Sequence, residues 1–183
     1  AVVRNIYDNT KKLKFLNFLC NIYLTVIRGT PVVVQLLIIY FVIFSSVRID
    51  KSFAAILAFG INSGAYQAEI FRSGINSVPK GQMEAGRSLG FSYPQTMITI
   101  IMPQVIKNIL PTLANEFIVL MKETSVASYI ALEDLTKAGD VIRSRTYSAM
   151  MPFLAVALLY LIMVMLFSYL VKLLERRLAR SGR

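Results

Sequence analysis

An uncharged apolar stretch near the carboxyl end constrains the fold more than any other feature of the sequence. No charged side chain occurs between Pro152 and Val171, and Lys172, Arg176 and Arg177 follow. About 20 mostly apolar helical residues are needed to cross the hydrocarbon core of a bilayer, and basic residues often flank such helices. The stretch therefore predicts a membrane-spanning helix that opens with a proline, a residue tolerated in the first turn.

The composition of the whole chain supports a membrane protein. Of the 183 residues, 56% are hydrophobic and 16% are charged, whereas soluble domains have about 45–50% apolar and about 25% charged residues. Disordered chains have low hydrophobicity, so disorder is excluded as well. We therefore expect one all-α membrane domain over residues 1–183.

The residue inventory also excludes several chemistries. The chain has no histidine and a single cysteine, Cys20, which rules out a disulfide within the chain and a His/Cys metal site. We predict no catalytic residue and no metal ligand. The net charge of +10 does not indicate nucleic-acid binding, because the basic residues gather at the ends of apolar stretches.

Three further spans are predicted, which makes about four in this chain: Pro31–Val47, Phe53–Ala68 and Val105–Met121. Thr30 is a candidate N-cap for the first of them, and residues 17–27 form an interfacial helix or bend into it. Small residues recur at every fourth position in the second, at Gly60, Gly64 and Ala68. Such a stripe favours close helix packing in lipid, although chance recurrence in an Ala/Gly-rich segment is the alternative.

The span over residues 105–121 carries polar residues on one face. Asn108, Thr112, Asn115 and Lys122 are spaced by four, three and seven residues, and Glu116 lies beside them. Polar and ionisable groups persist at membrane depth where they face protein or a wet cavity. We therefore expect this helix to line a path. Most Lys and Arg residues precede Pro31, separate the second and third spans, or follow Val171, which makes that side cytoplasmic.

The long cytoplasmic connection, at about residues 76–104, has the signals of two short helices. Ser77 is a candidate N-cap for a helix that opens at Val78–Pro79 and stops at Gly90. Ser92 and Gln95 have the spacing of a capping box that starts a second helix. A structured loop of this kind is a candidate docking surface.

The residues of this connection resemble a known motif. Glu84-Ala85-Gly86, then Gly90, then Ile100, Met102 and Pro103 resemble the EAA loop of permease subunits of bacterial ABC importers, with Gly86 and Met102 as departures. Further segments resemble the polar amino-acid branch of that family, whose members carry histidine, arginine, lysine or glutamine: Arg28–Pro31, Glu69–Ile75, Pro79–Gln82, Leu110-Pro111, Asn115, Lys122, Thr124 and Ser125.

The resemblance implies the transmembrane subunit of a type I ABC importer in the bacterial inner membrane, with a further helix before Ala1. It implies that Glu84, Ala85, Gly86, Gly90 and Pro103 belong to a coupling helix that contacts an ATPase dimer, the partner that binds ATP and Mg²⁺. It also implies a second permease subunit and an external solute-binding protein. The chain itself has no G-x-x-x-x-G-K-[S/T] phosphate loop and needs no cofactor of its own.

The resemblance also places residues in a transmembrane amino-acid site. Asn115, Glu116 and Lys122 are similar to residues that line it, with Lys122 suited to a carboxylate and Glu116 to an ammonium or guanidinium group. Alternatively, Lys122 extends toward the membrane edge and Glu116 pairs with it or with a neighbouring subunit. Glu69 and Arg72 are expected to form a structural pair.

Two other function classes stay open. A secondary carrier would use Glu116 as a proton or cation relay, but such carriers usually have more spans or an internal repeat. A membrane-embedded enzyme would depend on isolated carboxylates.

Overall fold

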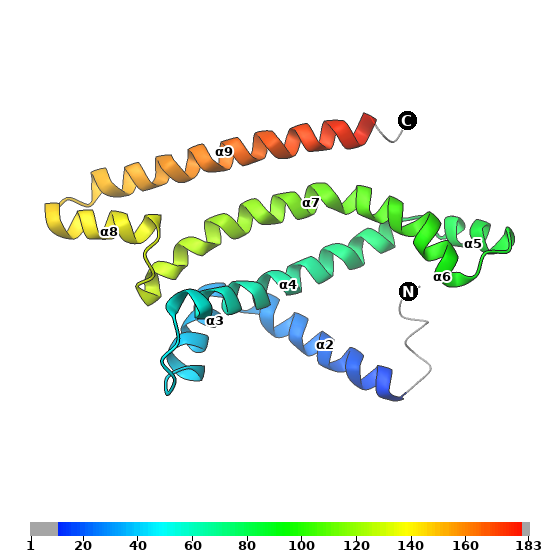
Figure 1. Cartoon of the computed structure of the whole chain (residues 1–183), viewed down its shortest axis with the longest axis horizontal. Coiled ribbons are helices and arrows are strands. Elements are labelled where there is room, and N and C mark those ends of the chain that lie inside the picture. Colours follow the sequence, from blue (N-terminus) through cyan, green and yellow to red (C-terminus); the bar gives the residue numbers. More distant parts are fainter. Residues whose placement is uncertain (1–10, 181–183) are drawn as a thin grey trace. The chain divides into compact units, whose positions relative to one another are not determined.

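The computed structural model describes residues 11–180, with side chains from Lys14 to Arg176, and every regular element in this part is helical. The chain divides into two compact units, whose helices are labelled in Figure 1. Unit 1 contains residues 11–29 and 64–113, and unit 2 contains residues 30–63 and 114–180. Two long helices, α4 (Lys51–Ser77) and α7 (Met102–Glu123), contribute one part to each unit.

Unit 1 surrounds a small apolar core. It contains α2 (Lys11–Gly29), the end of α4, the short helices α5 (Lys80–Ser88) and α6 (Tyr93–Thr96), the π-helix η2 (Met97–Ile101) and the start of α7. The buried side chains are Val78, Ile101, Val105 and Ile109. Gly74 of α4 is also buried, and a Cβ at this position would overlap the Cγ2 methyl of Ile109. Glycine thus lets α4 and α7 approach closely.

Unit 2 has its own core. It contains α3 (Val32–Ile38), the π-helix η1 (Ile39–Ile43), the start of α4, the end of α7, the 3₁₀-helix η3 (Thr124–Ile130), α8 (Leu135–Thr146) and α9 (Met150–Arg180). The buried hydrophobic side chains are Leu36, Ile39, Ala54, Ala55, Ala58, Phe59, Ala127 and Ile130. Phe117 and Phe167 meet edge to face at 5.6 Å between ring centroids, which joins α7 to α9.

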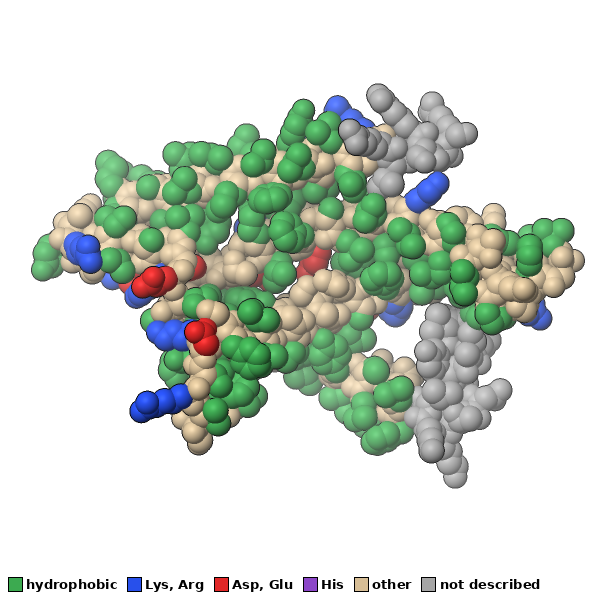
Figure 2. All heavy atoms as spheres, viewed as in Figure 1, with side chains coloured by type: hydrophobic (Ala, Val, Ile, Leu, Met, Phe, Trp, Pro, Cys, Tyr) green, Lys and Arg blue, Asp and Glu red, His purple; other side chains and the backbone are tan. Residues whose placement is uncertain are grey.

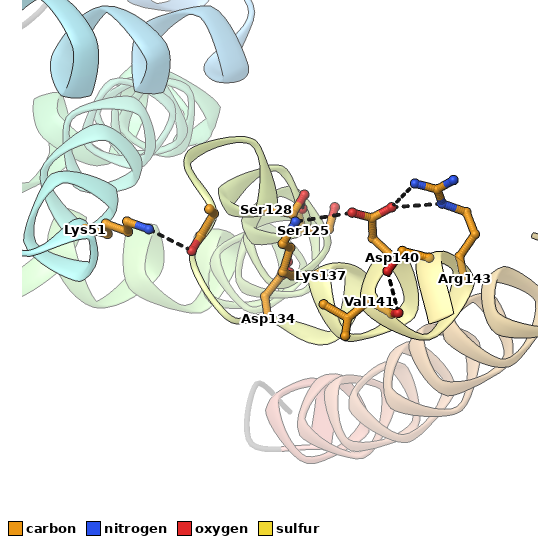
Figure 3. Close-up of polar contacts among 10 residues, drawn as sticks. Lys51, Ser125, Ser128, Asp134, Lys137, Asp140, Val141 and Arg143 are labelled. Carbon is orange, nitrogen blue, oxygen red and sulfur yellow. Dashed lines mark hydrogen bonds and ion pairs between the residues drawn. The ribbon is translucent and has the colours of Figure 1, made fainter. Parts of the chain in front are cut away.

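Polar contacts fix the connection from η3 to α8 (Figure 3). Lys51 Nζ donates to the carbonyl of Ala131 at 3.1 Å, and the backbone N–H of Lys137 donates to Asp134 Oδ1 at 2.7 Å, which caps α8. Asp140 accepts from Lys137 Nζ at 3.2 Å and from Arg143 Nη2 at 2.7 Å. The Arg143 hydrogen bond, followed by that of Lys137, lowers the pKa of the Asp140 carboxyl.

The helices α9 and α7 have the length and hydropathy of membrane spans. The helical stretches Tyr93–Ile130 and Met150–Arg176 qualify on these two measures, and a third span results if α2 and α3–η1 form one bent span. No part of the apolar window of α9 is buried within the chain, and hydrophobic side chains cover its length (Figure 2). The predicted span at Pro152–Val171 therefore lies in a helix that presents an apolar surface to lipid or to other subunits. At 27 residues α4 is long enough to span, but it is less apolar.

Two local predictions in this region need correction. Thr30 does not cap the helix that follows, because Pro31 occupies the N-cap position of α3; instead, Gln35 Nε2 donates to the hydroxyl of Thr30 at 2.8 Å and to its carbonyl at 3.1 Å. The helical part of the predicted first span ends at Ile43, before Val47.

The small-residue stripe of α4 makes a close contact at one position. A Cβ at Gly64 would lie 3.1 Å from the hydroxyl oxygen of Tyr23 on α2, whereas no described atom would lie within 4 Å of a Cβ at Gly60. Ala68 is exposed. Within the described residues, the stripe therefore packs against another helix only through Gly64.

Candidate functional site

The helices α5 and α6 form a hairpin, residues 80–96, whose turn depends on Gly90. The φ angle of Gly90 is +87°, a value that glycine adopts without strain. The N–H of Phe91 donates to the carbonyl of Gly86 at 3.2 Å, and the N–H of Gly90 donates to that of Arg87 at 3.1 Å. These are the two hydrogen bonds of a Schellman motif. The predicted helix stop at Gly90 is confirmed.

The second half of the hairpin starts with the predicted capping box. The backbone N–H of Ser92 donates to Gln95 Oε1 at 2.8 Å, and the N–H of Gln95 donates to Ser92 Oγ at 3.5 Å. The reciprocal pair satisfies two backbone donors that a helix start leaves without partners. This fixes the direction in which the chain leaves the turn.

The predicted start of the first half is wrong. Helix α5 begins at Lys80 with Pro79 in the N-cap position, whereas Ser77 is the last residue of α4. The Ser77 hydroxyl donates to the carbonyl of Gly74 at 2.7 Å and accepts from Asn108 Nδ2 at 3.1 Å. Its side chain is thus engaged between α4 and α7 and does not cap α5.

The packing around position 86 explains why glycine occupies the third position of the EAA pattern in this chain. Gly86 is buried, and a Cβ there would overlap the Cγ2 methyl of Thr96 and lie 3.0 Å from Cδ1 of Ile100. The side chain of Thr96 is fully buried, and its hydroxyl donates to the carbonyl of Ser92 at 3.0 Å. The hairpin can close this tightly because position 86 has no side chain.

The other residues of the motif occupy different surroundings. Glu84 and Ala85 are exposed on α5, and Pro103 is exposed in the first turn of α7. Next to them, the turn exposes two large apolar side chains, Leu89 at 77% and Phe91 at 39%. Neither residue was predicted from the sequence to belong to the site, although both flank Gly90. Large apolar side chains exposed at the tip of a hairpin offer a surface that another protein can cover.

The predicted substrate residues lie on the part of α7 that belongs to unit 2. Asn115 and Lys122 are exposed, and Glu116 is half-buried. Among the described side chains, neither Glu116 nor Lys122 takes part in an ion pair. Six residues of helix separate their Cα atoms by about 9 Å along the axis. The two residues also lie about 120° apart around the helix, because successive residues are rotated by about 100°.

A buried amide pair, which the sequence analysis missed, lies between α3 and α4. Asn62 Nδ2 donates to Gln35 Oε1 at 3.1 Å, and both side chains are buried. Buried amides need partners. The sequence signal for the pair was the presence of amide residues within two apolar segments, Gln35 in the first and Asn62 with Gln67 in the second.

Glu69 is the centre of a second polar cluster, in unit 1. Arg72 donates to Glu69 through both Nε and Nη2, which confirms the predicted pair. Arg28 of α2 adds an ion pair to Glu69 at 3.3 Å and lies 5.6 Å from the ring centroid of Tyr66. Two arginines thus flank one carboxylate.

Comparisons with known proteins identify the family of the chain. Residues 9–180 match the family described as binding-protein-dependent transport system inner membrane component. The glutamine transport system permease protein of Escherichia coli is 40% identical over 165 residues, which cover 88% of this chain and 75% of the relative. The arginine transport system permease protein of Bacillus subtilis is 37% identical over 163 residues, which cover 88% and 74%.

A solved structure resembles the chain as well. The crystal structure of an amino acid ABC transporter with histidines superposes with a TM-score of 0.84 at 45% identity, and the match covers 93% of this chain and 78% of that one. The chain therefore belongs to the family of binding-protein-dependent transport system inner membrane components, and it is an ABC importer permease subunit of the bacterial inner membrane.

Proposed function

We propose that the chain is the pore-forming subunit of an importer for polar amino acids, including basic ones, and that a separate ATPase dimer binds ATP and Mg²⁺ and supplies the energy. The relatives named for glutamine and arginine transport, together with the solved transporter with histidines, support this substrate class. A second permease, either a copy or a homologue, completes the pathway, and an external solute-binding protein delivers the amino acid.

The α5–α6 hairpin carries the proposed coupling. Glu84 and Ala85 contact the ATPase, and Leu89 and Phe91 add apolar contacts beside them. Gly86 and Gly90 hold the hairpin in one rigid shape, and the chain continues through η2 to Pro103 and into α7. Movement of the ATPase would thus be transmitted to a membrane helix as a rigid-body shift. The exposed Glu84 on a closed hairpin is the observation that carries the proposal.

The substitution Glu84→Lys tests the coupling in the reconstituted complex. We expect the subunit to insert normally and the transport-stimulated ATPase activity to be lost, because the exchange reverses the charge on the docking surface. Glu175→Lys on α9 makes the same charge reversal at another exposed position and should leave the stimulation intact. Normal coupled uptake by the Glu84→Lys complex would exclude Glu84 from docking.

The proposed amino-acid site consists of Asn115, Glu116 and Lys122. Lys122 binds the substrate carboxylate, and Glu116 binds the ammonium group or a cationic side chain. The absence of an ion-pair partner for Glu116 within the described residues supports this role, since a half-buried charge needs compensation.

The substitution Glu116→Gln tests the site by comparing substrates. We expect uptake of arginine to fall more than uptake of glutamine, because only the cationic side chain loses its charge partner. Glu133→Gln, at an exposed carboxylate between η3 and α8, is the matched control. An unchanged ratio of arginine to glutamine uptake would remove Glu116 from the site.

A further inference from the structure

A polar groove lies in unit 1 between the end of α4 and the start of α7. Its volume is about 530 Å³, and Glu69, Ile70, Ser73, Gly74, Ser77, Asn108, Ile109 and Thr112 line it. This volume lies within the range of small-molecule pockets, about 300–1,000 Å³. None of the residues proposed to bind substrate belongs to its lining.

Two hydroxyl groups of the lining are exposed and can form hydrogen bonds with a ligand. Ser73 and Thr112 are exposed, one from each helix. The hydroxyl of Ser77 already joins Gly74 to Asn108, which links α4 to α7 within the lining. Hydroxyl and amide groups can each donate or accept, so such a surface suits a ligand that carries both an ammonium and a carboxylate group.

Two arginines flank Glu69, the charged residue of the lining. Arg28 and Arg72 both pair with Glu69, so these three groups sum to one positive charge. The arginine side chains keep 40% and 66% of their surface exposed. Neither arginine lines the groove, so the surplus positive charge would act on the carboxylate of an amino acid from beside the groove, and only weakly.

One face of α7 carries residues of both the groove and the proposed substrate site. Positions 108, 112 and 115 share one helical face, and α7 is helical throughout this range. In a membrane helix, a continuous polar face marks a wet path. The groove lies on the part of the face nearer the predicted cytoplasmic end.

We infer that this groove is a second amino-acid site, a transient station between the Glu116–Lys122 site and the cytoplasm that takes the zwitterionic group of the substrate. The inference rests on the proposed transport function. The other possible occupant, a helix of the second permease, would exclude both water and substrate from the groove.

Cysteine accessibility in the complete complex distinguishes these occupants. Since Cys20 is the only cysteine of the chain, Cys20→Ser provides the background for Ser73→Cys and Thr112→Cys. A membrane-impermeant thiol reagent is applied to the cytoplasmic face of vesicles, with and without arginine or glutamine. Ile106→Cys is the control, because Ile106 is 49% exposed on α7 but does not line the groove.

We expect both groove cysteines to react, and saturating amino acid to slow the reaction about tenfold, which corresponds to about 1.4 kcal/mol of protection. Reaction at Ile106→Cys should not respond to the amino acid. Lack of reaction at both groove positions, or reaction without protection, would overturn the inference. ATP-driven uptake by the Cys20→Ser complex is measured first. If this complex takes up amino acid but the groove cysteines are not protected, only the inference of a second site is overturned. If it takes up no amino acid at all, both this inference and the proposed transport function are overturned.

Discussion

The substitution Gly86→Ala tests how closely the α5–α6 hairpin is packed. The new methyl group would overlap the Cγ2 methyl of Thr96, a side chain with no exposed surface. Overpacking of this kind costs about 1–3 kcal/mol. The higher helix propensity of alanine returns about 1 kcal/mol. The net effect is a hairpin less stable by about 1 kcal/mol.

Hydrogen exchange of the hairpin amides in the assembled complex measures this effect. A loss of 1 kcal/mol raises the local opening equilibrium, and thus the exchange rate, about fivefold. Gly81→Ala is the matched control on the same helix, because a Cβ there meets no described atom within 4 Å. It should slow exchange, since it brings the gain in helix propensity without the overlap.

A second substitution identifies the contact responsible. Thr96→Ser removes the Cγ2 methyl and keeps the hydroxyl that donates to the Ser92 carbonyl. The double variant Gly86→Ala/Thr96→Ser should therefore recover most of the protection lost in Gly86→Ala, which a double-mutant cycle measures as a coupling energy. If Gly86→Ala exchanged as slowly as Gly81→Ala, the proposed reason for glycine at this position would be refuted.

Three further outcomes follow from single contacts. Gly74→Ala should lower the free energy of unfolding by about 1 kcal/mol, because the new methyl meets Ile109 between α4 and α7 and the helix propensity of alanine offsets part of that cost; an unchanged thermal midpoint would contradict this packing. Tyr93→Phe should raise stability by about 1 kcal/mol, because the buried hydroxyl of Tyr93 has no hydrogen-bond partner within the described residues; a lower thermal midpoint would show that the hydroxyl has a partner. The pKa of Asp140 is lowered from 3.8 by Arg143 and Lys137, so its stabilisation of α8 should be complete above pH 3.8 and disappear as the pH falls through the lowered pKa; Asp140→Asn should abolish this pH dependence of amide protection in α8.

Features governed by neighbouring residues were predictable from the sequence. Gly90 ends a helix because only its own backbone must adopt a positive φ, and Ser92 with Gln95 caps the next helix within one turn. The apolar span at Pro152–Val171 follows from composition alone, and it lies in α9. Each of these depends on contacts within a few positions along the chain.

Features that depend on distant residues were missed. Serine is a typical N-cap residue, but α4 continues through Ser77, and Asn108, 31 positions away, donates a hydrogen bond to its hydroxyl. The burial of Gly86 against Thr96 and the amide pair of Gln35 with Asn62 likewise depend on how helices pack. Capping and propensity rules describe one segment at a time, so tertiary contacts override them.

The same limit applies to the candidate sites. The spacing of Asn108, Thr112 and Asn115 correctly placed them on one helix, but only the fold shows that α4 completes a groove with the first two of them. The EAA pattern identified both Glu84 and Gly86 as motif residues. Only the structure shows that Glu84 is exposed whereas Gly86 is buried.

Dependence of transport on the ATPase tests the central claim most directly. Vesicles are prepared with the permease alone and with the complete complex, and uptake of labelled arginine and glutamine is followed with and without ATP. We predict accumulation against a gradient only in vesicles that contain both the ATPase and ATP, because in the proposed function this chain contributes the pathway and the α5–α6 hairpin transmits the movement. Accumulation by vesicles that contain the permease alone would contradict the account.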